Sequence, residues 1–161
     1  MKCLEKHPIH ILSLGFGAGL VPFAPGTMGT VVGVVFYICL QHLPLPWYIL
    51  TVAILFILGV WSCGITARAI GVHDHPTIVW DEIVGFLVAM TAAPTGWGWI
   101  LLGFALFRLF DIVKPWPIWF IDTYVRGGLG IMLDDLLAGI YGLVSLRCVE
   151  IAFRKLEMHG L

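Results

Sequence analysis

Apolar runs alternate along this sequence with short breaks that are rich in proline, glycine or charge. Residues 9–22 mix apolar side chains with three glycines, which indicates a short helix or re-entrant segment. The loop Pro22–Thr30 contains two prolines and two glycines, and it ends in two suitable helix N-caps, Thr27 and Thr30. The apolar helix that begins there is expected to end near Leu43, before two further prolines.

The central part of the chain predicts one long helix and then a helical hairpin. The run Trp47–Ile65 is about one bilayer thickness as a helix, and the polar segment Thr66–Trp80 follows as a loop. The stretch Ile83–Phe107 is apolar but is interrupted by Ala93–Gly96, so it predicts two antiparallel helices. Each is roughly 11–14 residues long, against the roughly 20 of a full crossing.

The remaining chain predicts a connection and a last helix. Residues 112–133 are rich in proline and glycine, and the last helix is expected from Asp134 to about Met158. Its second half is amphipathic, so the tail 147–161 is expected to lie at the membrane interface or to emerge from it. No segment has the period of a strand, so the fold class is all-α, with one domain over residues 1–161.

Composition adds a membrane environment to this picture. The chain has 161 residues, of which 60% are hydrophobic and only 12% charged. Its mean hydropathy of +0.97 is far above that of a soluble protein. We therefore expect a compact, multi-pass, membrane-embedded bundle. The net charge of −1 offers no basic face to nucleic acid.

Terminal and cysteine patterns exclude some further classes. The basic N-terminus Met1–His7 is not followed directly by an apolar region with a cleavage site, so a cleaved signal peptide is not expected. The four cysteines, at positions 3, 39, 63 and 148, have no spacing typical of a zinc site or a disulfide framework. We expect them to be small buried hydrophobic residues.

Three islands of charge stand at the ends of apolar runs: Trp80–Ile83, Phe107–Lys114 and Leu133–Leu136. Together they hold five carboxylates, one arginine and one lysine. Carboxylates among apolar segments are costly unless positive charge holds them. The islands therefore predict one assembled site, with a divalent cation as the positive charge and a phosphate as the ligand.

The order of the helices brings these islands together. If the predicted helices cross back and forth, the loop Pro22–Thr30 and all three islands fall on the same face of the bundle. The sequence therefore predicts a charged site at one end of an all-α bundle. Arg108, Asp111 and Lys114 are spaced by three and share a helical face. Magnesium prefers oxygen ligands, and arginine and lysine suit phosphate oxygens.

Simpler interpretations of these features remain open at this point. Asp81 and Asp134 could be N-caps favoured by the helix dipole, although capping does not explain the second acid beside each. Arg108 and Asp111 could form only an ion pair within a helix. The loop Pro22–Thr30 could be a plain connector, or its glycines could let backbone N–H groups approach a phosphate.

Two further motifs are set aside. His73-Asp74-His75 has no third histidine or cysteine ligand nearby, so a solvated loop is the better interpretation. Cys63–Arg68 is one residue too short for the phosphate-binding loop of tyrosine phosphatases, and it lies at the end of an apolar helix.

At these charged islands the chain resembles the phosphatidylglycerophosphatase A family. The resemblance covers about residues 13 to 145, and no charged motif position departs from it. The matching motifs are Pro25-Gly26-Thr27-Met28-Gly29-Thr30, Asp81-Glu82-Ile83-Val84-Gly85, Phe107-Arg108-Leu109-Phe110-Asp111-Ile112-Val113-Lys114-Pro115-Trp116-Pro117 and Gly127-Gly128-Leu129-Gly130-Ile131-Met132-Leu133-Asp134-Asp135-Leu136-Leu137-Ala138-Gly139.

The resemblance implies a magnesium-dependent lipid phosphatase that converts phosphatidylglycerol phosphate to phosphatidylglycerol. It would act at the cytoplasmic face of a bacterial inner membrane, with catalytic motifs within residues 22–139. Metal ligands are expected to be Asp81, Glu82, Asp134 and Asp135. The expected catalytic residues are Asp111, as a further metal ligand or general base, together with Asp134, Arg108 and Lys114, and the expected substrate-binding residues are Thr27, Thr30, Arg108 and Lys114.

Three rivals are kept beside this hypothesis. In the mechanistic rival, Asp111 or Asp134 is a nucleophile that forms an aspartyl-phosphate. In the second, the chain is a lipid-headgroup phosphotransferase, although it lacks a nucleotide P-loop. In the third it is a small cation transporter, whose carboxylates should lie near the midplane of full-length spans rather than at segment ends.

Overall fold

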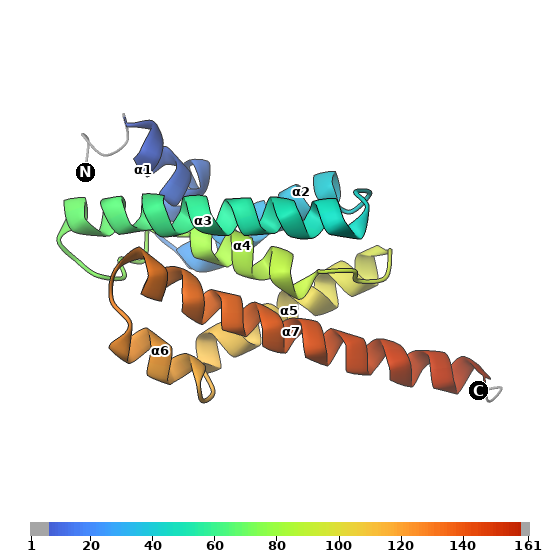
Figure 1. Ribbon diagram of the computed structural model, residues 1–161. Coiled ribbons are helices and arrows are strands. Elements are labelled where there is room, and N and C mark those ends of the chain that lie inside the picture. Colours follow the sequence, from blue (N-terminus) through green and yellow to red (C-terminus); the bar gives the residue numbers. More distant parts are fainter. Residues whose placement is uncertain (1–6, 159–161) are drawn as a thin grey trace.

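The computed structural model describes residues 7–158, and helices are the only regular secondary structure in that part of the chain, which confirms the all-α fold class (Figure 1). Cys3, most of the basic N-terminus and residues 159–161 of the tail lie outside the described residues. The elements are α1 (Pro8–Ser13), the 3₁₀ helix η2 (Gly15–Leu20), α2 (Pro25–Leu40), α3 (Leu45–Ile70), α4 (Trp80–Ala89), α5 (Trp97–Val113), α6 (Ile118–Tyr124) and α7 (Gly127–Met158).

Two long helices, α3 and α7, give the molecule its length. They have 26 and 32 residues, which correspond to about 39 and 48 Å. Both are long and apolar enough to cross a membrane, and only 33% and 28% of their apolar windows are buried inside the molecule. A core helix of a soluble protein would be mostly buried, so this exposure favours a membrane environment.

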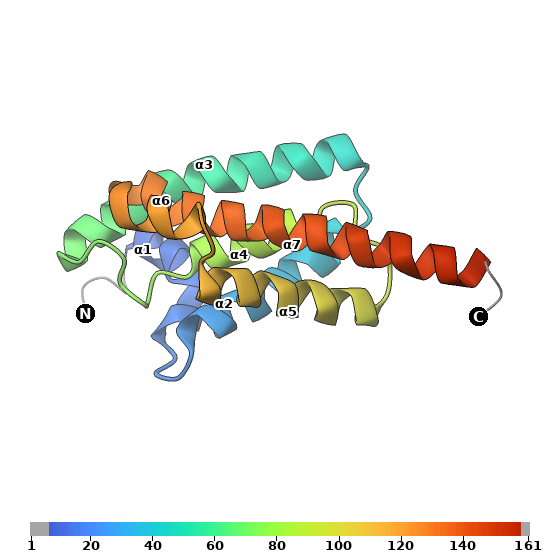
Figure 2. The ribbon, with the colours of Figure 1, turned by 90° about the horizontal axis from the view of Figure 1, so that it is seen from below.

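The short helix α4 lies in the middle of the bundle. It contacts α2, α3, α5 and α7 (Figures 1 and 2). Most of its residues are buried, including Trp80 and Phe86. A Cβ on Gly85 would lie 2.7 Å from the Asp135 carbonyl oxygen, so this glycine lets α4 and α7 approach closely. At 10 residues, α4 rises only about 15 Å and cannot cross a bilayer.

Several helix boundaries differ from the predicted ones. Helix α2 begins at Pro25, before both predicted caps, because proline is well suited to the first helical position. Helix α3 extends from Leu45 to Ile70, beyond the predicted Trp47–Ile65, and Gly71 ends it in a left-handed conformation. The connecting loop is therefore shorter than predicted.

The prediction that the last helix begins at Asp134 is wrong. Helix α7 begins at Gly127, about two turns earlier. Its glycines have low helix propensity, but a Cβ on Gly128 would lie 1.9 Å from the Val60 carbonyl oxygen. Close packing against α3 therefore overrides the propensity, and Asp134 cannot be an N-cap. Asp81 is not one either, because Val79 is the N-cap residue of α4.

The expectation that the cysteines are buried is correct for Cys63 alone among the described ones. Cys63 is fully buried in α3, whereas Cys39 and Cys148 are exposed. Both lie on apolar helices, so their exposure puts them on the outer surface of the bundle.

Candidate active site

A cavity of about 380 Å³ opens where α2, α4, α5, α7 and the loop between α3 and α4 meet. All three charged islands contribute to it, as the helix order predicts. Its lining residues are Ala24, Pro25, Gly26, Asp74, Pro76, Ile78, Asp81, Glu82, Arg108, Asp111, Ile112, Lys114, Asp134 and Asp135.

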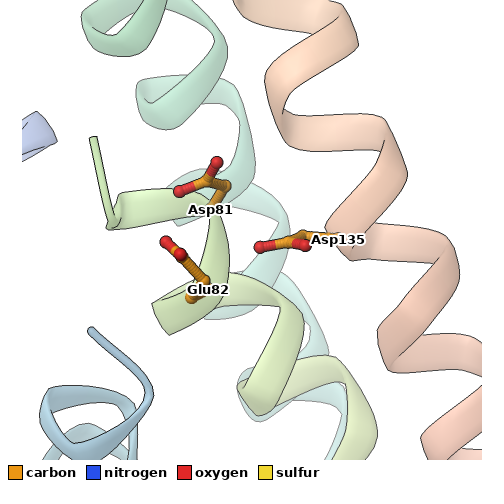
Figure 3. Close-up of side chains that lie close together, drawn as sticks. All are labelled: Asp81, Glu82 and Asp135. Atoms are coloured by element: carbon orange, nitrogen blue, oxygen red, sulfur yellow. The ribbon is translucent and has the colours of Figure 1, made fainter. Parts of the chain in front are cut away.

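Three carboxylates form the inner part of this cavity. Asp81 and Glu82 in the first turn of α4 face Asp135 on α7, and each offers an oxygen within 4.8 Å of the other two (Figure 3). Asp81 is only 6% and Asp135 only 3% exposed. Asp81 Oδ1 and Glu82 Oε2 are buried without a hydrogen-bond partner among the described residues. Unpartnered buried carboxylate oxygens are rare, and here two of them belong to carboxylates of the same cluster.

Their electrostatics favour a bound cation. Burial, and then the charge of Asp135, raises the pKa of Glu82 to about 8. Burial and the charge of Glu82 likewise raise the pKa of Asp81. Three ionised carboxylates this close cannot coexist in a low dielectric without positive charge. A hard divalent cation with oxygen ligands fits this donor set.

Arg108 lies beside this carboxylate cluster. Its guanidinium donates a hydrogen bond to Asp111 and lies 4.0 Å from Glu82 Oε1, while its Nε is buried without a partner in the described structure. The first turn of α2 packs against this pair, since a Cβ on Gly26 would lie 2.3 Å from Glu82 Oε1 and 3.0 Å from Arg108 Nη1. Glycine here brings the positive N-terminus of α2 to the cavity, which favours an anion.

Lys114 forms a second cationic group at the end of α5. Its Nζ lies 2.7 Å from Asp134 Oδ2 and 2.8 Å from Asp122 Oδ1 of α6. Burial acts to lower the pKa of Lys114, but the carboxylates of Asp134 and Asp122 together more than offset this, so the net shift is upward. The ammonium is therefore charged at any physiological pH.

A slot lined by glycines fixes the segment that leads into α4. The Val79 N–H donates to the Ser13 carbonyl at 2.9 Å. A Cβ on Gly19 would lie 1.9 Å from the Thr77 carbonyl oxygen, and one on Gly29 would lie 2.7 Å from Val79 Cβ. Residues 77–79 are thus held between η2 and α2, directly before the two carboxylates of α4.

The structure brings seven of the nine predicted site residues into one cavity and leaves two outside its lining. Thr30 is fully buried and its hydroxyl donates to the Gly26 carbonyl, and Thr27 does not line the cavity. Within the cavity, Asp134 contacts Lys114, while its neighbour Asp135 joins the carboxylate cluster. The Arg108–Asp111 ion pair exists, but inside a larger charged network.

Two carboxylates near the site were not predicted. Asp74 was assigned to a solvated loop, and it is indeed exposed, yet it lines the cavity. Asp122 lies on α6 and binds Lys114. The position of Asp74, on a loop at the same face as the three islands, was the one sequence signal available. Nothing in the spacing of Asp122 indicated its partner.

Comparison with known proteins adds an independent line of information. The family model described as phosphatidylglycerophosphatase A matches residues 11–150, which include every residue of the cavity. The Escherichia coli protein named phosphatidylglycerophosphatase A is 46% identical over 136 residues, covering 84% of this chain and 79% of the relative. Its Haemophilus influenzae namesake is 44% identical over 146 residues, covering 89% and 90%.

A third relative has a different name. A putative phosphatidylinositol-3-phosphatase of Bacteroides thetaiotaomicron is 37% identical over 142 residues, covering 83% of this chain and 88% of the relative. No solved structure gives a significant match.

Proposed function

Because the chain belongs to the phosphatidylglycerophosphatase A family, we propose that it is a magnesium-dependent phosphatase that converts phosphatidylglycerol phosphate to phosphatidylglycerol. The observation that supports this most strongly is the meeting of two buried carboxylates and one half-buried carboxylate with Arg108 and Lys114 in one cavity. Such a cavity can hold a divalent cation and a phosphate side by side.

Asp81, Glu82 and Asp135 would hold the metal, since two of them present unpartnered buried oxygens. A bound Mg²⁺ polarises a phosphoryl group and lowers the pKa of a water molecule. Asp134 stays a candidate fourth ligand, because its Oδ1 is also buried without a partner among the described residues.

The phosphate would lie against Arg108, Lys114 and the first turn of α2. The unpartnered Nε of Arg108 leaves donor capacity for a phosphate oxygen, and arginine binds such oxygens as a planar fork. Lys114 adds a point charge, and the α2 N-terminus adds backbone donors. These groups stabilise the negative charge of the transferring phosphoryl group.

Hydrolysis forms a bond from a water oxygen to phosphorus and breaks the bond from phosphorus to the ester oxygen. Asp111 is the proposed base that takes the proton from water, and a proton passes to the leaving alkoxide, which gives phosphatidylglycerol and inorganic phosphate. In the rival route Asp111 or Asp134 attacks phosphorus and an aspartyl-phosphate is then hydrolysed. Rapid quenching during turnover with ³²P-labelled substrate, followed by treatment with hydroxylamine, separates the two, because only the rival route leaves an acyl phosphate on the enzyme.

The deciding experiment measures release of inorganic phosphate from phosphatidylglycerol phosphate by the purified protein in mixed micelles. We expect release with Mg²⁺ and none with a chelator, and no change on adding CTP or ATP. Release that requires a nucleotide would favour a phosphotransferase instead. Absence of release under all conditions would contradict the proposed function.

A further inference from the structure

The most exposed large apolar side chains of the described structure include two at the rim of the cavity. Ile112 both lines the cavity and is 70% exposed. Phe23 is 85% exposed and directly precedes Ala24 and Pro25, which also line the cavity. Exposed apolar side chains therefore border the charged cavity at two separate elements, the segment that leads into α2 and the end of α5.

Helix lengths place this rim within the depth of a bilayer. Helix α2 ends at Leu40 and α3 begins at Leu45, so these two ends lie at the same face, and α5 begins at that face too (Figures 1 and 2). From there α2 and α5 rise only about 24 and 26 Å over their 16 and 17 residues, against about 39 Å for α3. The hydrocarbon core is about 30 Å thick. Counted from that face, both helices therefore end before they reach the headgroups of the opposite leaflet. The rim then lies just inside the hydrocarbon layer, where the acyl chains of that leaflet begin.

Another part of the cavity lining has a different chemistry. There the lining comes from the loop between α3 and α4, with Asp74 and Pro76. Asp74 is exposed, and His73 beside it accepts a hydrogen bond from the Gly127 N–H at 2.7 Å. The cavity therefore has a polar side on the loop and an apolar side between α2 and α5.

We propose that the phospholipid substrate enters this cavity sideways from the bilayer, with its acyl chains lying between Phe23 and Ile112 while its terminal phosphate meets Arg108. The inference rests on the proposed function and adds the route and the contacts of the diacylglycerol part. Water and released phosphate exchange on the side of Asp74. Contacts with acyl chains are made by the rim and not by the charged interior, so the rim determines the preference for a long-chain substrate.

The test compares two substrates that share the same phosphate but differ in their tails. We measure kcat/KM for long-chain phosphatidylglycerol phosphate in mixed micelles and for a dibutyryl analogue that stays monomeric in water. Phe23→Ser and Ile112→Ser are each expected to lower the ratio of the two values about tenfold, as loss of one large apolar contact does. The double variant should lower it further.

Leu101→Ser is the matched control. Leu101 lies on the same helix as Ile112 and is almost as exposed, at 67%, but it does not line the cavity. The ratio should therefore stay at the wild-type value. An unchanged ratio in both rim variants would overturn the proposal, and so would an equal fall in Leu101→Ser, which would indicate general lipid contact.

Two further measurements, the Tm of the variants and the activity of the wild-type protein on each substrate, distinguish the possible results. If Ile112→Ser lowers Tm, the Phe23→Ser variant decides, because the Phe23 side chain is almost fully exposed and its loss removes little packing. A wild-type protein that hydrolyses neither substrate contradicts the proposed function, whereas one that hydrolyses both equally well contradicts only the lateral route.

Discussion

At the scale of single residues, the carboxylate cluster is the feature with the sharpest consequences. Asp81 and Asp135 are almost fully buried, and their charges are separated from bulk water. Each can be made neutral with little change of shape by substitution with asparagine, so metal binding can be tested apart from packing.

We expect Asp81→Asn and Asp135→Asn to lower kcat by about 100-fold or more, since a metal ligand supplies several kcal/mol of transition-state stabilisation. The same changes should raise Tm in the metal-free protein, because they relieve repulsion between carboxylates. Phosphate release and thermal unfolding measure the two effects. Glu157→Gln, at an exposed position of the tail, is the control, and near-normal turnover in both cluster variants would refute the metal site.

The raised pKa of Glu82 makes metal binding depend on pH. Below its pKa of about 8 the carboxyl holds a proton that the metal must displace. Binding of Mg²⁺ at pH 7 should therefore release protons, and the affinity should rise with pH and level off above about pH 8. In the metal-free protein the folded state keeps this proton up to about pH 8, whereas the unfolded chain loses it near the ordinary pKa of 4.5, so stability falls as pH rises between these two values.

Calorimetric titration with Mg²⁺ at pH 7 checks this expectation. The measured binding enthalpy should differ between two buffers of unlike ionisation enthalpy, in proportion to the protons released. Identical heats in both buffers would show that the carboxyls are already ionised and would contradict the pKa shift.

Residue identity alone predicted which charges would meet but not how they would be paired. Asp81, Glu82 and Arg108 could be recognised because buried charges need partners. The sequence could not show that Asp134 pairs with Lys114 whereas Asp135 joins the carboxylate cluster, because this depends on how α7 is rotated against α4. Adjacent residues on a helix point about 100° apart, and sequence does not fix that rotation.

At the scale of elements, the glycine-lined slot around residues 77–79 determines where α4 begins. From the sequence these glycines are interpreted as breaks in structure. Their function in close packing appears only in the contacts that they make in the folded structure. The same reason explains the early start of α7, whose glycines pack against α3.

Gly19→Ala should displace residues 77–79 from the slot and thereby weaken the metal site, although Gly19 does not line the cavity. The added Cβ would meet the Thr77 carbonyl oxygen, which is backbone and cannot swing away. We expect the Mg²⁺ concentration for half-maximal activity to rise about tenfold, as for loss of a supporting contact around a metal.

Gly98→Ala is the control for that variant, because a Cβ there meets no other atom within 4 Å. If both variants lose stability equally and neither changes the Mg²⁺ requirement, the slot has only a structural role.

At the scale of the whole molecule, the cavity lies toward one end of the bundle and the far end of α7 projects from the other (Figure 1). Sequence predicted this convergence from helix order alone, because each apolar helix reverses the direction of the chain. It also predicted the end of the last helix correctly: α7 continues unbroken to Met158, and every side chain from Ile151 to Glu157 is exposed.

The tail changes the argument for orientation. On the cavity side the loops and helix ends carry Arg68, Lys114 and Arg126, while the loops Gln41–Trp47 and Pro94–Trp97 at the other side carry no lysine or arginine. The last turns of α7 add Arg147, Arg154 and Lys155 to that other side. The positive-inside rule also counts basic residues close to the end of a span, so the tail offsets the bias of the loops. We keep the proposal of a multi-pass inner-membrane protein with the cavity facing the cytoplasm because the family resemblance implies it.

Cysteine labelling in intact cells tests this orientation. With exposed cysteines removed, a cysteine at Thr95 should react with a membrane-impermeant reagent, and one at His73 should react only after the cells are opened. The opposite pattern would reverse the orientation, and reaction of both from outside would contradict a bilayer-spanning arrangement.

Helix α4 is held at both ends. Before its first turn, residues 77–79 are held in the slot by packing and by the hydrogen bond from the Val79 N–H. Beyond its last turn, the Arg147 guanidinium of α7 donates to the carbonyl oxygens of Thr91 and Ala92. A helix fixed in this way cannot slide along its axis, so its two carboxylates cannot draw back from Asp135.

The consequence is discrimination between cations by their radius. Mg²⁺ binds oxygen at about 2.0–2.1 Å, and Ca²⁺ needs about 2.3–2.6 Å and more ligands. Because the distance between the carboxylates of α4 and Asp135 is fixed, the site should bind the smaller ion more tightly. Releasing one end of α4 should raise the affinity for the larger ion. We therefore expect Arg147→Met to narrow the difference between Mg²⁺ and Ca²⁺ affinities measured by calorimetry, whereas Arg154→Met, at an exposed position on the same helix, should leave the difference unchanged.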